Sequence, residues 1–238
     1  MYELTSTEHK AADSQRQNQS SVIVSQLRED IIRGIFLPGE KLLISSLKQR
    51  YGVGSSPIRE ALSQLITERL VVAESQRGFR ASPISREELT SIYEARSEVE
   101  ASITAFAIER GDDAWEAGIV GAAYRLFKVD QTVPDGERVA RWELCHRNLH
   151  EAIVLGCKSP QLLDVRLMLY TRAERYRQLW LKETVLDLHS LARSQIEHQR
   201  LIDSVLQRRK EEAVDLVRQH ILMPVTVIYA TLNQKQIL

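Results

Sequence analysis

The sequence predicts a mainly α-helical protein with two parts, an N-terminal winged helix-turn-helix with a small β wing and a C-terminal all-α helical bundle. Three observations support this fold class. Two short helical segments flank a glycine-containing break between residues 45 and 66, two short strand-like runs follow them, and from residue 86 onward the apolar residues keep helical spacing. At 238 residues, with 43% hydrophobic and 27% charged residues, the chain is long enough for two modest domains.

The segment from Ser55 to Ile66 is predicted to form the helix around which the N-terminal part is organised. Ser56 is expected to cap this helix, and Pro57 to occupy its first position, where a missing N–H costs nothing. The apolar residues fall on one face at i, i+3 and i+4 spacing, which leaves Arg59 on the other face in the first turn. One face is therefore expected to join the core, and the other is free to contact a partner.

The neighbouring segments predict what that free face contacts. Residues 45–51 are expected to form a short capped helix, and residues 52–54 a tight turn. Residues 71–73 and 79–81 are expected to form strands on either side of a polar hairpin tip. In a winged helix-turn-helix, the N-terminal turn of the second helix enters the major groove of DNA. Double-stranded operator DNA is therefore the predicted partner, and the candidate contacts are Ser45, Ser55, Ser56, Arg59, Arg77 and Gly78.

The charge distribution favours the same partner. The formal net charge of the chain is zero, but residues 41–80 carry seven cations and three anions, a local excess of +4. A homodimer doubles this modest basic patch and reads two half-sites, so we expect a homodimer on a short near-palindrome.

Two further features bear on location. No stretch approaches about 18 consecutive apolar residues, and the N-terminus shows no apolar signal segment, so no membrane partner and no export are expected. Cys145 and Cys157 are too few for a disulfide framework and suit a reducing compartment. The expected location is cytoplasmic.

Composition and periodicity predict the domain boundaries. Residues 1–18 are polar and without periodicity, so a disordered tail is expected. Helical spacing between residues 22 and 32 predicts the first helix of a DNA-binding domain over residues 19–83. A Ser-Pro-Ile-Ser stretch and a capping-box pattern then begin a helical domain over residues 84–238. About six helices are expected there, with breaks near Gly111, 133–136, 156–160, 182–187 and 208–210.

Four histidines of the second domain are candidate metal ligands. His146 and His150 are four residues apart, so both imidazoles lie on one face of a helix. His198 and His220 lie on apolar stripes on either side of a break near Arg209, each roughly 15 Å from the turn, so two antiparallel helices would bring them level. One buried histidine is usually satisfied by a protein partner, but four in one domain are hard to satisfy singly. Shared ligation of a divalent metal, Zn or Ni, is therefore expected.

The N-terminal part resembles a known family. Its strings are similar to those of the GntR family of bacterial transcription regulators: Leu37-Pro38-Gly39-Glu40-Lys41-Leu42, Gly52-Val53-Gly54-Ser55-Ser56-Pro57-Ile58-Arg59-Glu60-Ala61-Leu62 and Arg77-Gly78-Phe79. Family members usually carry an Arg two residues before the Pro, where this chain has Ser55. This departure shifts the expected DNA contacts toward Arg59, Arg77 and the backbone at Gly78.

The helical part resembles the FCD ligand-binding domain of the FadR-type branch of that family. Many such domains bind a metal with one Asp and three His. By position, His150, His198 and His220 match the three histidines, whereas His146 stands where the Asp is usual. Glu143, three residues earlier, stays open as an alternative fourth ligand, because four neutral histidines leave the charge of the metal uncompensated.

The same resemblance implies a small carboxylate effector. Arg96 matches an arginine that often binds the effector carboxylate, although an ion pair with Glu100 at i+4 is an alternative role. Arg175 is a second candidate, with a structural role as its alternative. The segments 142–150, 173–177 and 180–185 are especially similar to the carbon-starvation-induced, glutarate-responsive repressors of this branch, which implies glutarate or 2-hydroxyglutarate.

Together these observations predict a DNA-binding repressor that leaves its operator when a small carboxylate binds near a metal in the helical domain. The alternative is a metal-dependent enzyme with an appended DNA-binding module. An enzyme would need an open metal position beside a positioned general base, and the sequence offers only unspecific carboxylates such as Glu143, Glu174 and Glu197. We therefore do not expect an enzyme.

Overall fold

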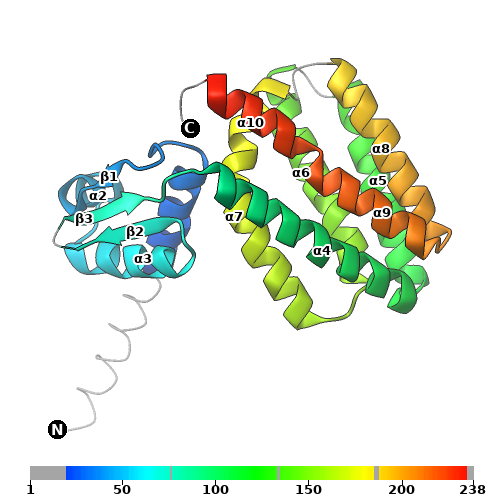
Figure 1. Ribbon diagram of the computed structural model, residues 1–238, viewed down its shortest axis with the longest axis horizontal. Coiled ribbons are helices and arrows are strands. Elements are labelled where there is room, and N and C mark those ends of the chain that lie inside the picture. Colours follow the sequence, from blue (N-terminus) through cyan, green and yellow to red (C-terminus); the bar gives the residue numbers. More distant parts are fainter. Residues whose placement is uncertain (1–19, 76, 133–134, 185–187, 235–238) are drawn as a thin grey trace, which may run out of the picture. The chain divides into compact units, whose positions relative to one another are not determined.

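A computed structural model describes residues 20–75, 77–132, 135–184 and 188–234 (Figure 1). The chain divides into two compact units, residues 1–85 and 86–238. Within the described ranges, helices dominate and the strands form one three-stranded sheet in the first unit. The predicted fold class, a winged helix-turn-helix with a small β wing plus an all-α domain, is thereby confirmed. The predicted tail, residues 1–18, lies outside the described residues.

The first unit begins with a helix over residues 20–32. It is followed by β1 (Lys41–Leu42), α2 (Ile44–Tyr51), α3 (Ser55–Thr67), β2 (Val71–Glu74) and β3 (Gly78–Ala81). The sheet order is β1-β3-β2 with antiparallel pairing throughout, and Leu42 is opposite Phe79. Strand β1 was not predicted because two residues are too short to show an alternating pattern. It exists through its pairing with β3.

The buried face of α3 is the one that its apolar spacing predicts, comprising Ile58, Ala61, Leu62 and Leu65. The predicted start of α3 is wrong, however. The N-cap residue is Gly54 in an extended conformation, and no side chain makes a cap hydrogen bond, so Ser56 lies inside the first turn. The first amide groups of α3 are therefore not used by a side-chain cap, and such groups are suited to bind a phosphate oxygen.

The helix before α3 also begins without a side-chain cap. Helix α2 starts at Ile44 with Leu43 as its N-cap residue and has no side-chain cap hydrogen bond, so the expectation of a capped helix over residues 45–51 is wrong in this respect. Its C-cap is Gly52, whose φ of 65° lies in the left-handed region that glycine adopts without steric cost. This reversal of the chain gives the turn between the two helices, as the break at residues 52–54 predicts.

The described residues of the second unit form helices joined by short turns. Its helices are α4 (Arg86–Arg110), α5 (Asp113–Thr132), α6 (Asp135–Leu155), α7 (Pro160–Thr184), α8 (Leu188–Leu206), α9 (Lys210–Leu222) and α10 (Pro224–Gln234). The breaks near Gly111, 156–160 and 208–210 are confirmed, and the other two predicted breaks include residues outside the described ranges. The break before Pro224 was missed, although proline is common at the first position of a helix.

Helix α4 is the central element of this unit. It packs most extensively against α9 and also against α7, and Figure 1 shows α4 and α9 side by side. Besides its apolar residues, α4 buries four polar ones, namely Arg96, Ser97, Glu100 and Thr104. Burial of charged groups on a central helix is costly unless they have partners, so these residues direct attention to the space between α4 and its neighbours. No helix in the described ranges combines the length and the low polarity that a membrane span requires.

Candidate functional site

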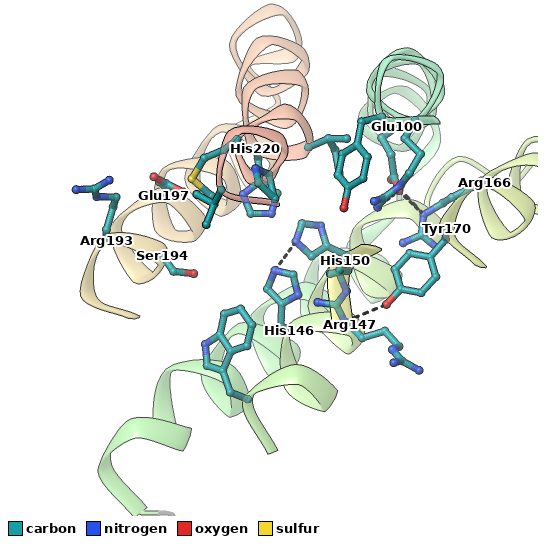
Figure 2. Close-up of a pocket in the computed structure, with 18 residues that line it drawn as sticks. Glu100, His146, Arg147, His150, Arg166, Tyr170, Arg193, Ser194, Glu197 and His220 are labelled. Carbon is teal, nitrogen blue, oxygen red and sulfur yellow. Dashed lines mark hydrogen bonds and ion pairs between the residues drawn. The ribbon is translucent and has the colours of Figure 1, made fainter. Parts of the chain in front are cut away.

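Three helices bring the four predicted histidines together. His146 and His150 come from α6, His198 from α8 and His220 from α9, and one potential ligand atom from each lies within 4.8 Å of the others. The ring centroids of His198 and His220 are 4.7 Å apart, as expected for two antiparallel helices that meet near Arg209. Figure 2 shows the imidazoles of His146, His150 and His220 directed toward one another.

Two of the nitrogen separations are those expected between ligands of one metal ion. The Nε2 atom of His150 lies 3.2 Å from Nε2 of His146 and 3.3 Å from Nε2 of His198. Two nitrogens bound to one ion at about 2.0–2.1 Å lie about 2.9–3.4 Å apart when the angle between them is about 90–110°, a range that includes ions with more than four ligand positions. The donor set, imidazole nitrogen, is one that Zn and Ni accept.

One histidine is fixed in the tautomer that a metal needs. The Nδ1 atom of His198 lies 2.6 Å from the carbonyl oxygen of Ser194, which can only accept a hydrogen bond. Nδ1 therefore carries the proton and donates it, and Nε2 presents its lone pair to the cluster. His198 is 1% exposed, and the ring of Trp142 stacks on that of His146 with 4.6 Å between centroids. Such contacts orient ligands before a metal arrives.

Burial keeps the four imidazoles neutral. Loss of solvent lowers the pKa of each, to about 4 for His198. The pKa values of His146, His150 and His220 are lowered further by neighbouring imidazoles and by guanidinium groups. Neutral imidazole is the form that binds metal, so near neutral pH an ion need not displace protons from these ligands.

The cluster borders a small cavity. Its volume is about 170 Å³, and its lining includes His146, His150 and His220 together with Tyr93, Arg96, Arg166 and Tyr170. Figure 2 shows Arg166 and Tyr170 lying across the cavity from the histidines. Sites for drug-sized ligands have volumes of roughly 300–1,000 Å³, so this cavity suits a smaller molecule.

Arg96 lies on the wall of this cavity between two aromatic rings. Its guanidinium carbon is 5.3 Å from the ring centroid of Tyr93 and 5.4 Å from that of Tyr170. The ion pair with Glu100 is long, at 3.8 Å, because Glu100 accepts from Nε of Arg166 at 3.1 Å with both oxygens. The alternative role predicted for Arg96, an ion pair with Glu100, therefore exists only as a long contact.

Two buried donors in this wall have no hydrogen-bond partner among the described residues, namely Nε of Arg96 and the hydroxyl of Tyr93. The Tyr93 side chain is 1% exposed. Buried polar groups are nearly always satisfied, so an unsatisfied pair beside a cavity indicates a missing partner such as a ligand. Sequence reasoning missed Tyr93, although its place three residues before Arg96 puts it on the same side of α4.

Arg175, the second arginine predicted to bind the effector, lies outside the lining of this cavity. It lies on α7, is buried, and pairs with Glu88 of α4, which also accepts a hydrogen bond of 2.6 Å from the hydroxyl of Tyr176. Arg175 is not part of the cavity wall described above.

Glu143 is also held away from the histidines. Its carboxylate accepts hydrogen bonds from Arg177 at 2.5 Å and from Gln178 at 3.0 Å. The cluster of potential ligands in the described ranges consists of the four histidines and does not include Glu143.

The predicted DNA contacts lie on the surface of the first unit. Each of the predicted contacts is exposed, namely Ser45, Ser55, Ser56, Arg59, Arg77 and Gly78. Arg59 stands in the N-terminal part of α3, and Arg77 adjoins Gly78 at the start of β3. Gly78 has a φ of 94°, which favours glycine at this turn. By contrast, Arg50 and Arg80 form ion pairs with Asp30 and Glu74 and are less available for a partner.

Comparison with family models matches both units. Residues 19–80 match the model described as "Bacterial regulatory proteins, gntR family", and residues 91–222 match the FCD domain. The HTH-type transcriptional repressor GlaR of Escherichia coli K12 is 44% identical over 202 residues, which cover 85% of this chain and 92% of GlaR. The uncharacterized HTH-type transcriptional regulator BphR of Paraburkholderia xenovorans is 34% identical over 205 residues, which cover 85% of this chain and 82% of BphR.

Two solved structures share the fold. Escherichia coli McbR/YncC superposes with a TM-score of 0.71 at 17% sequence identity, covering 89% of this chain and 97% of that one. A putative transcriptional regulator GntR from Rhodococcus sp. RHA1 gives a TM-score of 0.69 at 20% identity, covering 90% and 98%. At these identities the likeness concerns the fold alone.

Proposed function

The chain belongs to the GntR family of bacterial regulatory proteins and carries an FCD domain, and we propose that it is a repressor released from its operator by a small carboxylate. Membership of that family makes it a DNA-binding transcriptional regulator. The name of GlaR, a repressor at 44% identity, supports repression. The observation that carries the effector proposal is the pair of unsatisfied donors on Tyr93 and Arg96 beside the four-histidine cluster.

A divalent metal, Zn or Ni, is proposed to bind the four imidazoles. When bound, such an ion supplies positive charge and a position that a carboxylate oxygen can occupy. The acid is proposed to be glutarate or 2-hydroxyglutarate, because a two-ended acid can direct one carboxylate to the cluster and the other to Arg96. The guanidinium of Arg96 has the geometry to bind it.

The proposed response is a shift between two arrangements of a homodimer. The acid disfavours operator binding only to the extent that it binds one arrangement of the helical domain better than the other. The dimer, the cytoplasmic location and the near-palindromic operator are parts of this proposal, and no enzymatic activity belongs to it. A gel-shift titration tests it: operator binding by the metal-loaded protein should weaken as glutarate or 2-hydroxyglutarate is added, and the acid should be recovered unchanged. Operator affinity indifferent to both acids would contradict the proposal.

Tyr93→Phe is expected to raise the dissociation constant for the acid at least about tenfold. The change removes one hydroxyl from a buried site and keeps the ring, and a hydrogen bond to a charged group contributes about 1.5–3 kcal/mol. Isothermal titration of the metal-loaded protein with glutarate measures the effect. Tyr124→Phe is the matched control, because Tyr124 is 64% exposed on α5 and should leave the constant unchanged. Equal constants for Tyr93→Phe and the parent would remove Tyr93 from the site.

Arg59→Ala is expected to weaken operator binding by about 1–3 kcal/mol, because it removes an exposed cation from the N-terminal part of α3, the helix expected to enter the major groove. A gel-shift titration at fixed salt concentration measures the change. Arg200→Ala removes an exposed cation from α8 in the helical unit and serves as the control. If both variants bind the operator as the parent does, Arg59 makes no contact that matters.

A further inference from the structure

The four-histidine cluster has no anionic member. All four donor groups are imidazoles, which bind metal in their neutral form, so the ligand set brings no negative charge. A divalent ion held by these groups alone would keep its full +2 charge in a largely buried position. Uncompensated charge in such a place is unfavourable.

The surrounding wall does not supply the missing negative charge. Arg96, Arg166 and Arg177 line the same cavity as His146, His150 and His220 and bring positive charge to it. The nearby carboxylates are already engaged: Glu100 accepts two bonds from Arg166, while Glu143 and Glu174 both accept from Arg177.

One more carboxylate borders the cavity, that of Glu197 on α8. Glu197 has Arg193 as its charged neighbour, and Figure 2 shows both of them to one side, away from His146 and His150. Within the described wall, a metal ion would therefore be surrounded by neutral ligands, cations and carboxylates that are engaged or, like Glu197, lie to one side. A small anion that enters the cavity would bring a negative charge that the four ligands do not supply.

We propose that the metal and the acid bind as a mutually dependent pair, and that His146 is the residue that makes each dependent on the other. This inference rests on the proposed function in one respect, that a carboxylate enters this cavity. Coupling between two ligands is reciprocal, so the factor by which the acid tightens the metal equals the factor by which the metal tightens the acid. The protein then responds to the joint presence of a divalent metal and a small carboxylate.

The role of His146 follows from its place in the cluster. Its imidazole nitrogen is 3.2 Å from that of His150, so a side chain at this position reaches the ion. An aspartate there would bring a permanent negative charge to the metal. Metal binding would then need no external anion, and an incoming carboxylate would meet an ion that is already partly neutralised.

The test compares the full-length, metal-free parent with His146→Asp. Each is titrated with Zn²⁺ against a competing chromophoric chelator, alone and with saturating glutarate, acetate or the uncharged diamide glutaramide. For the parent, glutarate or acetate should tighten Zn²⁺ at least fivefold, the low end of ordinary coupling between sites, and glutaramide should not. For His146→Asp, Zn²⁺ should bind more tightly without acid, and the tightening by acid should fall below twofold.

Two further variants keep the test decisive. Leu144→Asp adds the same charge at an exposed position on α6 and should behave as the parent. His220→Asp places a carboxylate in the cluster from α9 and should repeat the result if His146→Asp fails to fold by circular dichroism. The inference is overturned if neither acid changes the Zn²⁺ affinity of the parent. It is also overturned if a folded Asp variant shows coupling between acid and Zn²⁺ as large as that of the parent. Operator binding takes no part in this measurement, so loss of the gel-shift response with intact coupling refutes only the proposed function.

Discussion

His198→Ala is expected to remove both the bound metal and the response to acid, while the protein still dimerises and binds its operator. His198 is 1% exposed, its Nε2 lies 3.3 Å from that of His150, and the carbonyl of Ser194 fixes its tautomer. Loss of a hydrogen-bond partner of a metal ligand already costs about 10–100-fold in affinity, so loss of the ligand itself should cost more than 100-fold. Elemental analysis after dialysis and gel shifts with added acid measure the two effects.

Ser194→Ala is the matched control for this variant. The acceptor for Nδ1 of His198 is the main-chain carbonyl of Ser194, which the substitution keeps, whereas the hydroxyl lies 3.2 Å from the same nitrogen. Metal content and acid response should therefore remain near those of the parent. If His198→Ala carries no metal and yet responds to acid as the parent does, the metal has a structural or incidental role and the proposed link between metal and effector is wrong.

Local sequence patterns predicted those parts of the fold whose cause is local. The i, i+4 spacing of His146 and His150 places both rings on one side of α6, and the equal distances of His198 and His220 from the turn bring α8 and α9 into register. Strand β1 and the glycine cap of α3 depend instead on pairing and turn geometry, which adjacent residues do not reveal. Those features were missed for that reason.

The arginines of α7 show why the candidate site was only partly predictable. At about 100° per residue, Arg166 and Arg177 differ by roughly 20° around the helix, whereas Arg175 lies roughly 180° from Arg166. Arg166 and Arg177 accordingly line the cavity, while Arg175 faces Glu88. The sequence shows that Arg175 lies on the opposite side of α7 from Arg166 and Arg177. Which side faces the cavity depends on the packing of α7 against α4, a tertiary contact with no local signature.

Glu100→Gln is expected to reduce the free energy of unfolding of the helical domain by about 3 kcal/mol. Glu100 is 3% exposed and accepts both hydrogen bonds from Nε of Arg166, so its loss leaves a buried guanidinium with one remaining partner, Glu151, at 2.8 Å. Removing one member of a buried ion pair costs about 3–5 kcal/mol, and the remaining partner places this case at the low end. Urea denaturation of the metal-free protein, followed by circular dichroism, measures the loss.

Glu151, the second carboxylate that pairs with Arg166, provides the control variant. The side chain of Glu151 is 50% exposed, so Glu151→Gln removes a solvated ion pair and should cost less than about 1 kcal/mol. Equal losses for the two variants would show that burial does not set the contribution of this network.

The same Glu100→Gln variant should bind the acid more tightly than the parent, even though its fold is less stable. Glu100 is a carboxylate in the cavity wall, so it repels an incoming carboxylate, and its neutralisation also frees Arg166 to attract the acid. Removing one like charge several Å away is favourable by on the order of 1 kcal/mol, or roughly a fivefold lower dissociation constant. Isothermal titration with glutarate at a temperature well below unfolding separates the two effects. If the substitution simply damaged the cavity, both the affinity for the acid and the free energy of unfolding would fall. A higher affinity together with a lower free energy of unfolding is therefore the result expected if the charges of the wall select an anion.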